Sequence, residues 1–260
     1  MMGALYSAAS GMKAQQLNTD VISNNLSNVN TTGYKKARAE FQDLLYRTAA
    51  EAGVPVSGGT VIPVGTQVGS GVRSVAIMRV FSQGDFVQTE NPLDMVIEGD
   101  GFFQIQMPDG TRGYTRDGSF KIDRSGQILT QEGLLLIPNI SLPQGIIRPN
   151  VSQEGLVTGS LNGSQVTLGQ IQLVRFINPA GLTNLGHNLY GVTSASGEPI
   201  EGLPGTEGLG NVLQGFLENS NVRVVDEMVN LIVAQRAYEA NSKAIQTSDE
   251  MLAMANTLKR

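Results

Sequence analysis

Apolar residues recur in alternating steps of three and four along the N-terminal end of the chain. The series runs through Leu5, Ala8, Met12, Gln15, Thr19, Ile22, Leu26 and Val29, with polar residues at two of the positions. This spacing places one stripe along one face of a helix and is typical of a coiled-coil seam. We expect the helix to continue to about Asn28, because Asn30, Thr31, Thr32 and Gly33 are turn and capping residues.

A second stripe follows the C-terminal end, where Leu231, Tyr238, Ile245 and Leu252 recur every seven residues. Flanking positions of the same period hold Ala237, Ala244, Met251 and Leu258, and the small residues Ala234, Asn241, Ser248 and Ala255. We expect this helix to begin after residues 219–221, whose Asn and Ser side chains can cap it. A forty-residue helix is about 60 Å long. Each stripe therefore needs a partner of similar length, and the simplest partner is the other terminus.

Between the two helices the hydrophobic period becomes two, from residue 72 to about residue 215. Phe103, Ile105 and Met107 alternate with glutamines, which predicts a half-buried strand. Turn signals such as residues 108–110 (Pro-Asp-Gly) and 162–163 (Asn-Gly) separate the short apolar runs. Short strands joined by such turns predict an antiparallel β domain.

The segment that links the first helix to the β domain has a composition of its own. Residues 34–46 fit a short helix or an extended arm, and the stretch from Ala52 to Gly71 contains eight Gly or Pro residues, too many for a helix. The predicted fold is therefore α+β. Residues 1–33 and 219–260 form a paired coiled-coil domain, residues 34–71 form an extended Gly/Pro-rich arm, and residues 72–218 form a central antiparallel all-β domain.

Composition narrows the function. Charged residues make up 16% of the chain, the net charge is -5, and the basic residues are scattered, so nucleic acid is not an expected partner. No transmembrane run exists, which predicts no direct membrane insertion, and the N-terminus does not resemble a cleaved secretory signal. Without cysteine and with His187 as the only histidine, the chain predicts no metal site and no cofactor.

Catalysis is also not expected. Carboxylate pairs such as Asp94 with Glu98, or Asp100 with Asp109, lie among turn residues, where Asp usually stabilises loops. A secreted, β-rich, carbohydrate-active enzyme would account for the Gly-rich strands. However, such an enzyme needs acidic and aromatic residues clustered in a groove, and this chain has 5% aromatic residues and no Trp.

Four asparagines, Asn24, Asn25, Asn28 and Asn30, are unusual inside a helix because their side chains compete with the backbone for hydrogen bonds. They fit either a frayed helix end or a helix that is stable only among copies of itself, and we favour the second because the apolar stripe continues to Val29. The Tyr238 and Met251 stripe fits ordinary core equally well. The predicted assembly interface comprises Leu5, Ala8, Met12, Ile22, Leu26, Val29, Leu231, Ala234, Tyr238, Ala244, Ile245, Met251 and Leu252.

Several motifs resemble those of the bacterial flagellar axial proteins of the rod and hook. The N-terminal motif covers residues 23–35 and includes Asn24, Asn25, Asn28 and Gly33, and the C-terminal motif includes Gln235, Arg236, Ala237 and Tyr238. Residues 100–103, 108–110 and 114–120 are similar to the β domain that rod and hook subunits share. Arg223 departs from the pattern, which has a small polar residue there.

The resemblance implies an exported structural subunit without a cleaved signal peptide, located in the flagellar basal body, where the rod spans the periplasm. Chain length and the Gly/Pro segment favour the distal rod, a straight helical tube that would transmit motor torque to the hook. A proximal rod or hook subunit is the alternative. The implied partners are copies of the chain itself, proximal rod subunits, hook or hook-junction subunits, P- and L-ring bushing proteins and the export apparatus.

Overall fold

The computed structural model describes residues 2–51, 64–143, 145–161 and 164–257. The chain divides into two compact units, each described here by itself. The helical unit comprises Met1–Leu26, Ala37–Met78 and Arg223–Arg260, and the β unit comprises Ser27–Lys36 and Arg79–Val222. Part of the Gly/Pro stretch, the Asn162-Gly163 turn and Leu258 lie outside the described residues.

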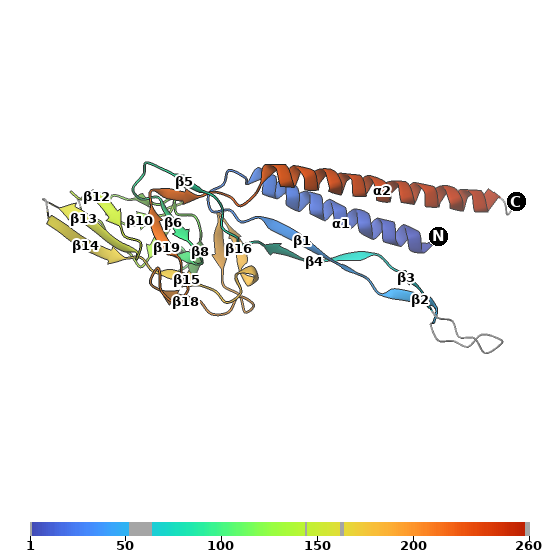
Figure 1. Ribbon diagram of the computed structural model, residues 1–260, viewed down its shortest axis with the longest axis horizontal. Coiled ribbons are helices and arrows are strands. Elements are labelled where there is room, and N and C mark those ends of the chain that lie inside the picture. The colour runs from blue at the N-terminus through green and yellow to red at the C-terminus, as the bar shows by residue number, and fades with distance from the viewer. Residues whose placement is uncertain (1, 52–63, 144, 162–163, 258–260) are drawn as a thin grey trace. The chain divides into compact units, whose positions relative to one another are not determined.

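Two long helices lie side by side in the helical unit, α1 (Met2–Ser27) and α2 (Val224–Thr257) (Figure 1). The end of α1 agrees with the predicted break near Asn28. Helix α2 carries Asp226 and Glu227 in its first turn, where carboxylates interact favourably with the positive end of the helix dipole. Within the described residues, neither helix has a stretch both long and apolar enough to cross a membrane.

Four strands complete the helical unit. They are β1 (Ala37–Asp43), β2 (Tyr46–Ala50), β3 (Thr66–Gly69) and β4 (Val72–Arg79). Strands β1 and β4 form one two-stranded sheet, here called the ribbon, and β2 and β3 form a second, antiparallel one. The short helix considered for residues 34–46 is wrong, because the chain is a strand from Ala37 to Asp43. Strand β4, expected in the β domain, groups with the helices because it pairs with β1.

The β unit is built around β7 (Phe102–Gln106), which pairs antiparallel with β8 (Arg112–Thr115), β11 (Leu135–Ile137) and β15 (Leu173–Arg175). The same nine-stranded sheet contains β9 (Lys121–Ile122), β10 (Ile128–Leu129), β16 (Thr183–Gly186), β17 (Leu189–Gly191) and β18 (Ile200–Gly202). A 3₁₀ turn, η1 (Pro179–Gly181), precedes β16.

Smaller sheets complete the unit. Strands β12 (Ile147–Val151), β13 (Leu156–Leu161) and β14 (Ser164–Gln170) form one; β6 (Met95–Glu98) pairs with β19 (Asn211–Gln214), and β5 (Phe86–Gln88) pairs with β20 (Phe216–Glu218). The predicted α+β class is therefore confirmed as two terminal helices around a central antiparallel β domain.

The half-buried pattern predicted for Phe103 to Met107 is wrong in one respect. Phe103 and Ile105 lie in the larger apolar cluster, and Phe102 lies in a second cluster with Tyr114 and Phe176. Gln104, which lies between Phe103 and Ile105 in the strand, is also fully buried. Both faces of β7 are covered, because the larger cluster packs on the side of Phe103 and Ile105 and the second cluster packs on the side of Phe102 and Gln104. The glutamine therefore does not mark a solvent face.

Candidate assembly interface

Helix α2 has one continuous line of buried or half-buried side chains. Its members are Glu227, Leu231, Ala234, Asn241, Ile245, Ser248 and Leu252, at steps that keep them on one face. Of the predicted interface residues in α2, Leu231, Ala234, Ile245 and Leu252 lie on this line. Tyr238, Ala244 and Met251 are exposed. The covered face of α2 is therefore narrower than the stripe in the sequence and includes a carboxylate.

The predicted interface residues at the N-terminal end are all at least partly covered. Ala8 and Ile22 are buried, and Leu5, Met12, Leu26 and Val29 are half-buried, with Val29 in the β unit.

Two close approaches join α1 to α2 within the helical unit. A Cβ atom at Gly11 would lie 2.8 Å from Nδ2 of Asn241, so the absence of a side chain at Gly11 lets the asparagine approach α1. Farther along, Nδ2 of Asn25 donates to Oε2 of Glu227 at 3.4 Å, and both side chains are buried. Polar groups therefore occupy the space between the two helices at both points, alongside the apolar stripe.

The ribbon is attached to α1 through two polar side chains. Asn25 donates through Nδ2 to the carbonyl oxygen of Ala37 and accepts through Oδ1 from its amide, each at 2.8 Å. Ser10 accepts through Oγ from the Val72 amide at 3.2 Å and donates to the carbonyl of Ser7 at 2.8 Å. Figure 1 shows α1 between α2 and the ribbon, which gives the helical unit three layers.

Hydrogen bonds and an ion pair hold the end of the N-terminal motif in the β unit. The amide of Gly33 donates to the carbonyl oxygen of Glu218 at 2.8 Å. Lys35 Nζ forms a 2.6 Å ion pair with Glu218 Oε1, both side chains being 1% exposed, and also donates to the carbonyl of Ser82 at 2.8 Å. Burial lowers the pKa of Lys35, and the Glu218 carboxylate opposes that shift. The motif thus joins the segment after α1 to the strand before α2.

Other motif residues lie on the surface of their elements. Gln235 and Arg236 are exposed on α2, where Arg236 pairs with Glu239 at 3.4 Å, and Ala237 is half-buried. Asn24 is exposed, and the half-buried Asn28 accepts at Oδ1 from the Thr31 hydroxyl at 3.2 Å.

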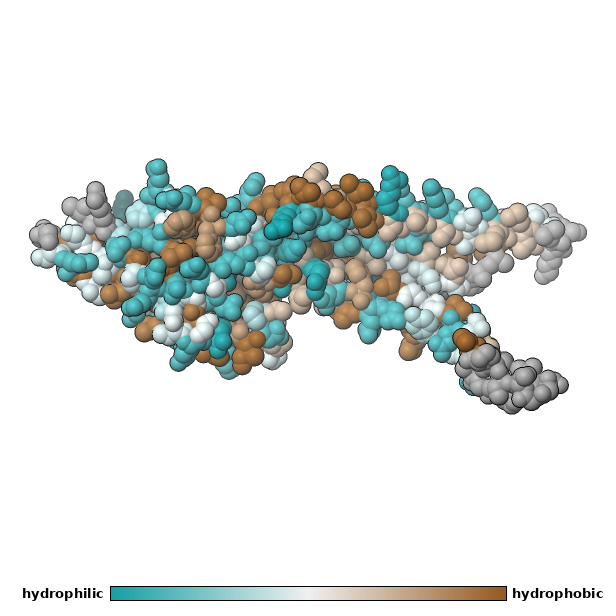
Figure 2. Space-filling view, viewed as in Figure 1, coloured by the Kyte–Doolittle hydropathy of each residue, from teal (hydrophilic) through white to brown (hydrophobic). Residues whose placement is uncertain are grey.

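The first turns of α2 carry an exposed apolar surface, the α2 patch, made of Val225, Met228, Val229, Ile232 and Val233. Figure 2 shows hydrophobic residues gathered over this start of α2. Val225 is 72% exposed and Val233 is 62% exposed. Contiguous exposed apolar surface marks interaction sites. Sequence reasoning missed the patch because it followed the seven-residue repeat, although residues 228–234 are apolar around nearly the whole helix.

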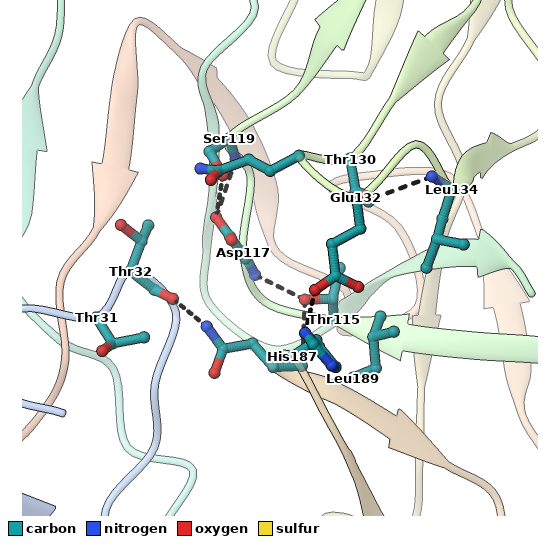
Figure 3. A pocket seen from close by; sticks show the side chains of 12 residues that line it. Thr31, Thr32, Thr115, Asp117, Ser119, Thr130, Glu132, Leu134, His187 and Leu189 are labelled. Carbon is teal, nitrogen blue, oxygen red and sulfur yellow. Dashed lines mark hydrogen bonds and ion pairs between the residues drawn. The ribbon is translucent and has the colours of Figure 1, made fainter.

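A polar pocket of about 310 Å³ lies in the β unit (Figure 3). Hydroxyls of Thr115, Ser119 and Thr130 line it, and His187 contacts Glu132 at its edge. Its side chains largely bond to one another or to backbone: Ser119 donates to Asp117 through N and Oγ, and Asn188 donates to the carbonyl of Thr32 at 2.8 Å. Burial raises the pKa of Asp117. Among the described residues, no group of three His, Asp or Glu could hold a metal ion.

Two of the four carboxylates weighed as catalytic candidates, Asp94 and Asp109, stabilise local structure. Asp109 accepts from the amide and hydroxyl of Thr111, which lowers its pKa, and Asp94 accepts from Asn91 at 2.8 Å. These bonds hold turns, as expected for Asp among Gly and turn residues.

Three family models match the chain. The model described as flagella basal body rod protein matches residues 5–35, the flagellar hook protein FlgE/F/G D1 domain matches residues 96–159, and the flagellar basal body rod FlgEFG protein C-terminal model matches residues 213–258. These matched ranges contain α1 with the N-terminal motif, the central strands, and most of α2.

Full-length relatives carry one name. The flagellar basal-body rod protein FlgG of Borreliella burgdorferi is 54% identical over all of both chains. FlgG of Caulobacter vibrioides is 48% identical over 99% of this chain and 100% of its own. The flagellar hook protein FlgE of Helicobacter mustelae is 43% identical over 52% of this chain and 30% of its own.

Proposed function

This chain belongs to the family of flagellar basal-body rod proteins named FlgG, and we propose that it self-assembles into the straight distal rod and transmits motor torque to the hook. It is a structural subunit, and its activity is mechanical: load passes through packed side chains without a chemical step. The observation that carries the proposal is the pair of terminal helices, each bearing a seam of apolar and small residues, next to an exposed apolar patch on α2.

The helical seams are proposed to form the inner wall of the tube. Within one subunit, α1 and α2 would pair as a coiled coil along Ala8, Ile22, Ala234 and Ile245, supported by the approaches at Gly11 and Asn25. The exposed Tyr238, Ala244 and Met251 would then pack against neighbouring copies. Residues 1–33 and 219–260 would build the core, with residues 34–71 as a bridging arm. The remainder up to residue 218 would form the outer layer, except for β4, which groups with the helices.

Assembly into a helical tube needs a contact between unlike surfaces of identical subunits. When the rotation between successive copies does not close, such a contact grows into a filament. Proximal rod subunits and hook or hook-junction subunits would continue the tube at its two ends. The P- and L-ring bushing proteins would surround it, and the export apparatus would deliver the subunit without signal cleavage to the basal body.

Replacing a seam residue by a carboxylate tests this proposal. Leu26→Asp or Ile245→Asp places a charge on the covered face of a helix, which is costly without a partner, and is expected to abolish polymerisation seen by electron microscopy. The control is Leu185→Asp, the same kind of change at an exposed position of β16. Hydrogen exchange at β7 checks that the β unit remains folded. Normal filaments from both seam variants would contradict the scheme.

A hook subunit is the second candidate, because the hook protein of Helicobacter mustelae matches about half of the chain. The curvature of filaments grown from the purified chain separates the two. Straight filaments support the rod, and curved filaments support the hook.

A further inference from the structure

The α2 patch faces away from α1. At about 100° per residue, Val225, Val229 and Ile232 point about 140–200° from Glu227, which contacts Asn25 of α1. Leu231 and Ile245, on the covered line, lie within about 40° of Glu227. The α2 patch and the covered line therefore lie on opposite faces of α2. Among the described residues of the helical unit, nothing covers the α2 patch.

The ribbon also has an outward face. In β4, residues 73–77 are all exposed and only the ends are half-buried. Val75 and Ile77, which are 57% and 53% exposed, are the large apolar side chains of this exposed stretch. Because alternate residues of a strand point to opposite sides, Val75 and Ile77 share the face away from Val72. Arg73 lies on that same face, exposed, and donates to Gln42 of β1 at 2.9 Å.

These two apolar surfaces cannot meet within one chain. Helix α1 contacts α2 through Asn25 and Gly11, and it contacts the ribbon through Asn25 and Ser10. At Asn25, α2 and the ribbon accept from the same Nδ2 atom, so both lie beside this part of α1. The α2 patch points away from Glu227 and therefore from this shared contact, so it does not meet the outer face of the ribbon of its own chain, and a second copy is needed to bring the two surfaces together.

We infer that the α2 patch of one copy docks on the outer face of the β1–β4 ribbon of the next copy, an inference that rests on the proposed self-assembly. The dimensions agree: Val225 to Val233 spans about 12 Å of helix, and Arg73 to Ile77 spans about 13 Å of strand. The charges agree as well, because exposed Asp226 lies at the start of the patch and exposed Arg73 lies at one end of the ribbon face.

The charges set the orientation of the contact. With Asp226 beside Arg73 of the next copy, Val229 meets Val75 and Val233 meets Ile77. Each subunit then offers its patch on one side and its ribbon on the other. Such a heterologous contact repeats from copy to copy without satisfying itself in a closed pair.

Cross-linking tests the contact, because the chain has no cysteine of its own. The double variant Ile77→Cys/Val233→Cys is expected to form disulfide-linked ladders on oxidation of assembled filaments, and only monomers when oxidised before assembly. The matched control Ile77→Cys/Lys243→Cys moves one thiol along the exposed surface of α2 and is expected to give no ladder, since a disulfide needs Cα atoms within about 7 Å. Dimers from Val233→Cys alone would show patch-to-patch contact and overturn the inference.

Charge reversal tests the orientation. Asp226→Arg and Arg73→Asp each place like charges together and are expected to raise the critical concentration for assembly by about tenfold or more. The double variant restores an opposite pair and is expected to assemble near the wild-type concentration. If wild-type chain assembles but the single reversals have no effect, or the double variant is not rescued, this docking is wrong while the proposed function stands. If wild-type chain does not polymerise at all, the proposed function fails instead.

Discussion

Asn25 and the backbone of Ala37 exchange two hydrogen bonds of 2.8 Å, so that a helix side chain pairs with strand β1 as a neighbouring strand would. The same carboxamide also reaches Glu227 of α2. One residue of the N-terminal motif thus contacts both other layers of the helical unit. This gives the asparagine a structural role that does not depend on assembly.

Replacing Asn25 should release the ribbon. Asn25→Ala leaves the buried backbone groups of Ala37 without these partners, and we expect a loss of about 2–4 kcal/mol in the free energy of unfolding, from roughly 1–3 kcal/mol for each group. Asn25→Asp keeps the acceptor but places a second carboxylate beside buried Glu227 and the Ala37 carbonyl oxygen, so it should be at least as destabilising. Amide exchange along β1 should accelerate in both variants. The exposed Gln16→Ala is the control, and unchanged exchange in Asn25→Ala would contradict the anchoring role.

The buried ion pair between Lys35 and Glu218 predicts a non-additive response. Lys35→Met leaves a carboxylate buried without its counter-ion, which costs about 3–5 kcal/mol of stability. Lys35→Met/Glu218→Gln removes both charges, keeps an acceptor for the Gly84 amide, and should recover part of that loss. Denaturant unfolding of the wild type, Lys35→Met, Glu218→Gln and the double variant measures the coupling. Removal of the exposed Arg38–Glu40 pair should cost no more than about 1 kcal/mol.

Gly33 should not tolerate a side chain. Its φ of +69° is unfavourable for other residues, and a Cβ atom there would lie 2.7 Å from the Asp117 amide nitrogen. Gly110 has a φ of +82° with nothing within 4 Å of an added Cβ, so Gly110→Ala isolates the backbone cost of about 1–2 kcal/mol. The loss of stability in Gly33→Ala, measured by thermal or denaturant unfolding, should exceed the loss in Gly110→Ala. Equal losses would mean that the close approach has no energetic effect.

The stability of the β unit should fall at alkaline pH. Burial raises the pKa of Tyr190 from its ordinary 10.0 to about 12. Between these values the folded state holds a proton that the unfolded state has lost, so stability declines as pH rises through the window. Tyr190→Phe keeps the ring that packs on Phe81 and Phe102 and should show a shallower decline. Tyr6→Phe removes the hydroxyl of an exposed tyrosine, and its stability should decline with pH as that of the wild type does.

Local periodicity was enough to predict the two helices and the antiparallel strands. The repeat that begins at Leu5 and the repeat through Ile245 both lie in helices, and the short alternating runs between turns lie in strands. Such patterns predict elements because the side chains on one face recur about every 3.6 residues along a helix and every two residues along a strand. They could not distinguish a short helix from an arm at residues 34–46, where the outcome depends on strand β4, pairing with β1 from far along the chain.

Burial and contact partners were decided only by the tertiary structure. Gln104 is buried because both faces of its strand are covered, and Asn25 is buried because α1 lies between α2 and the ribbon. Met251 and Tyr238 fit the heptad repeat yet remain exposed, while Glu227 occupies the covered line. Sequence spacing sets which side chains share a face of an element, whereas the layer that meets this face depends on contacts between distant residues.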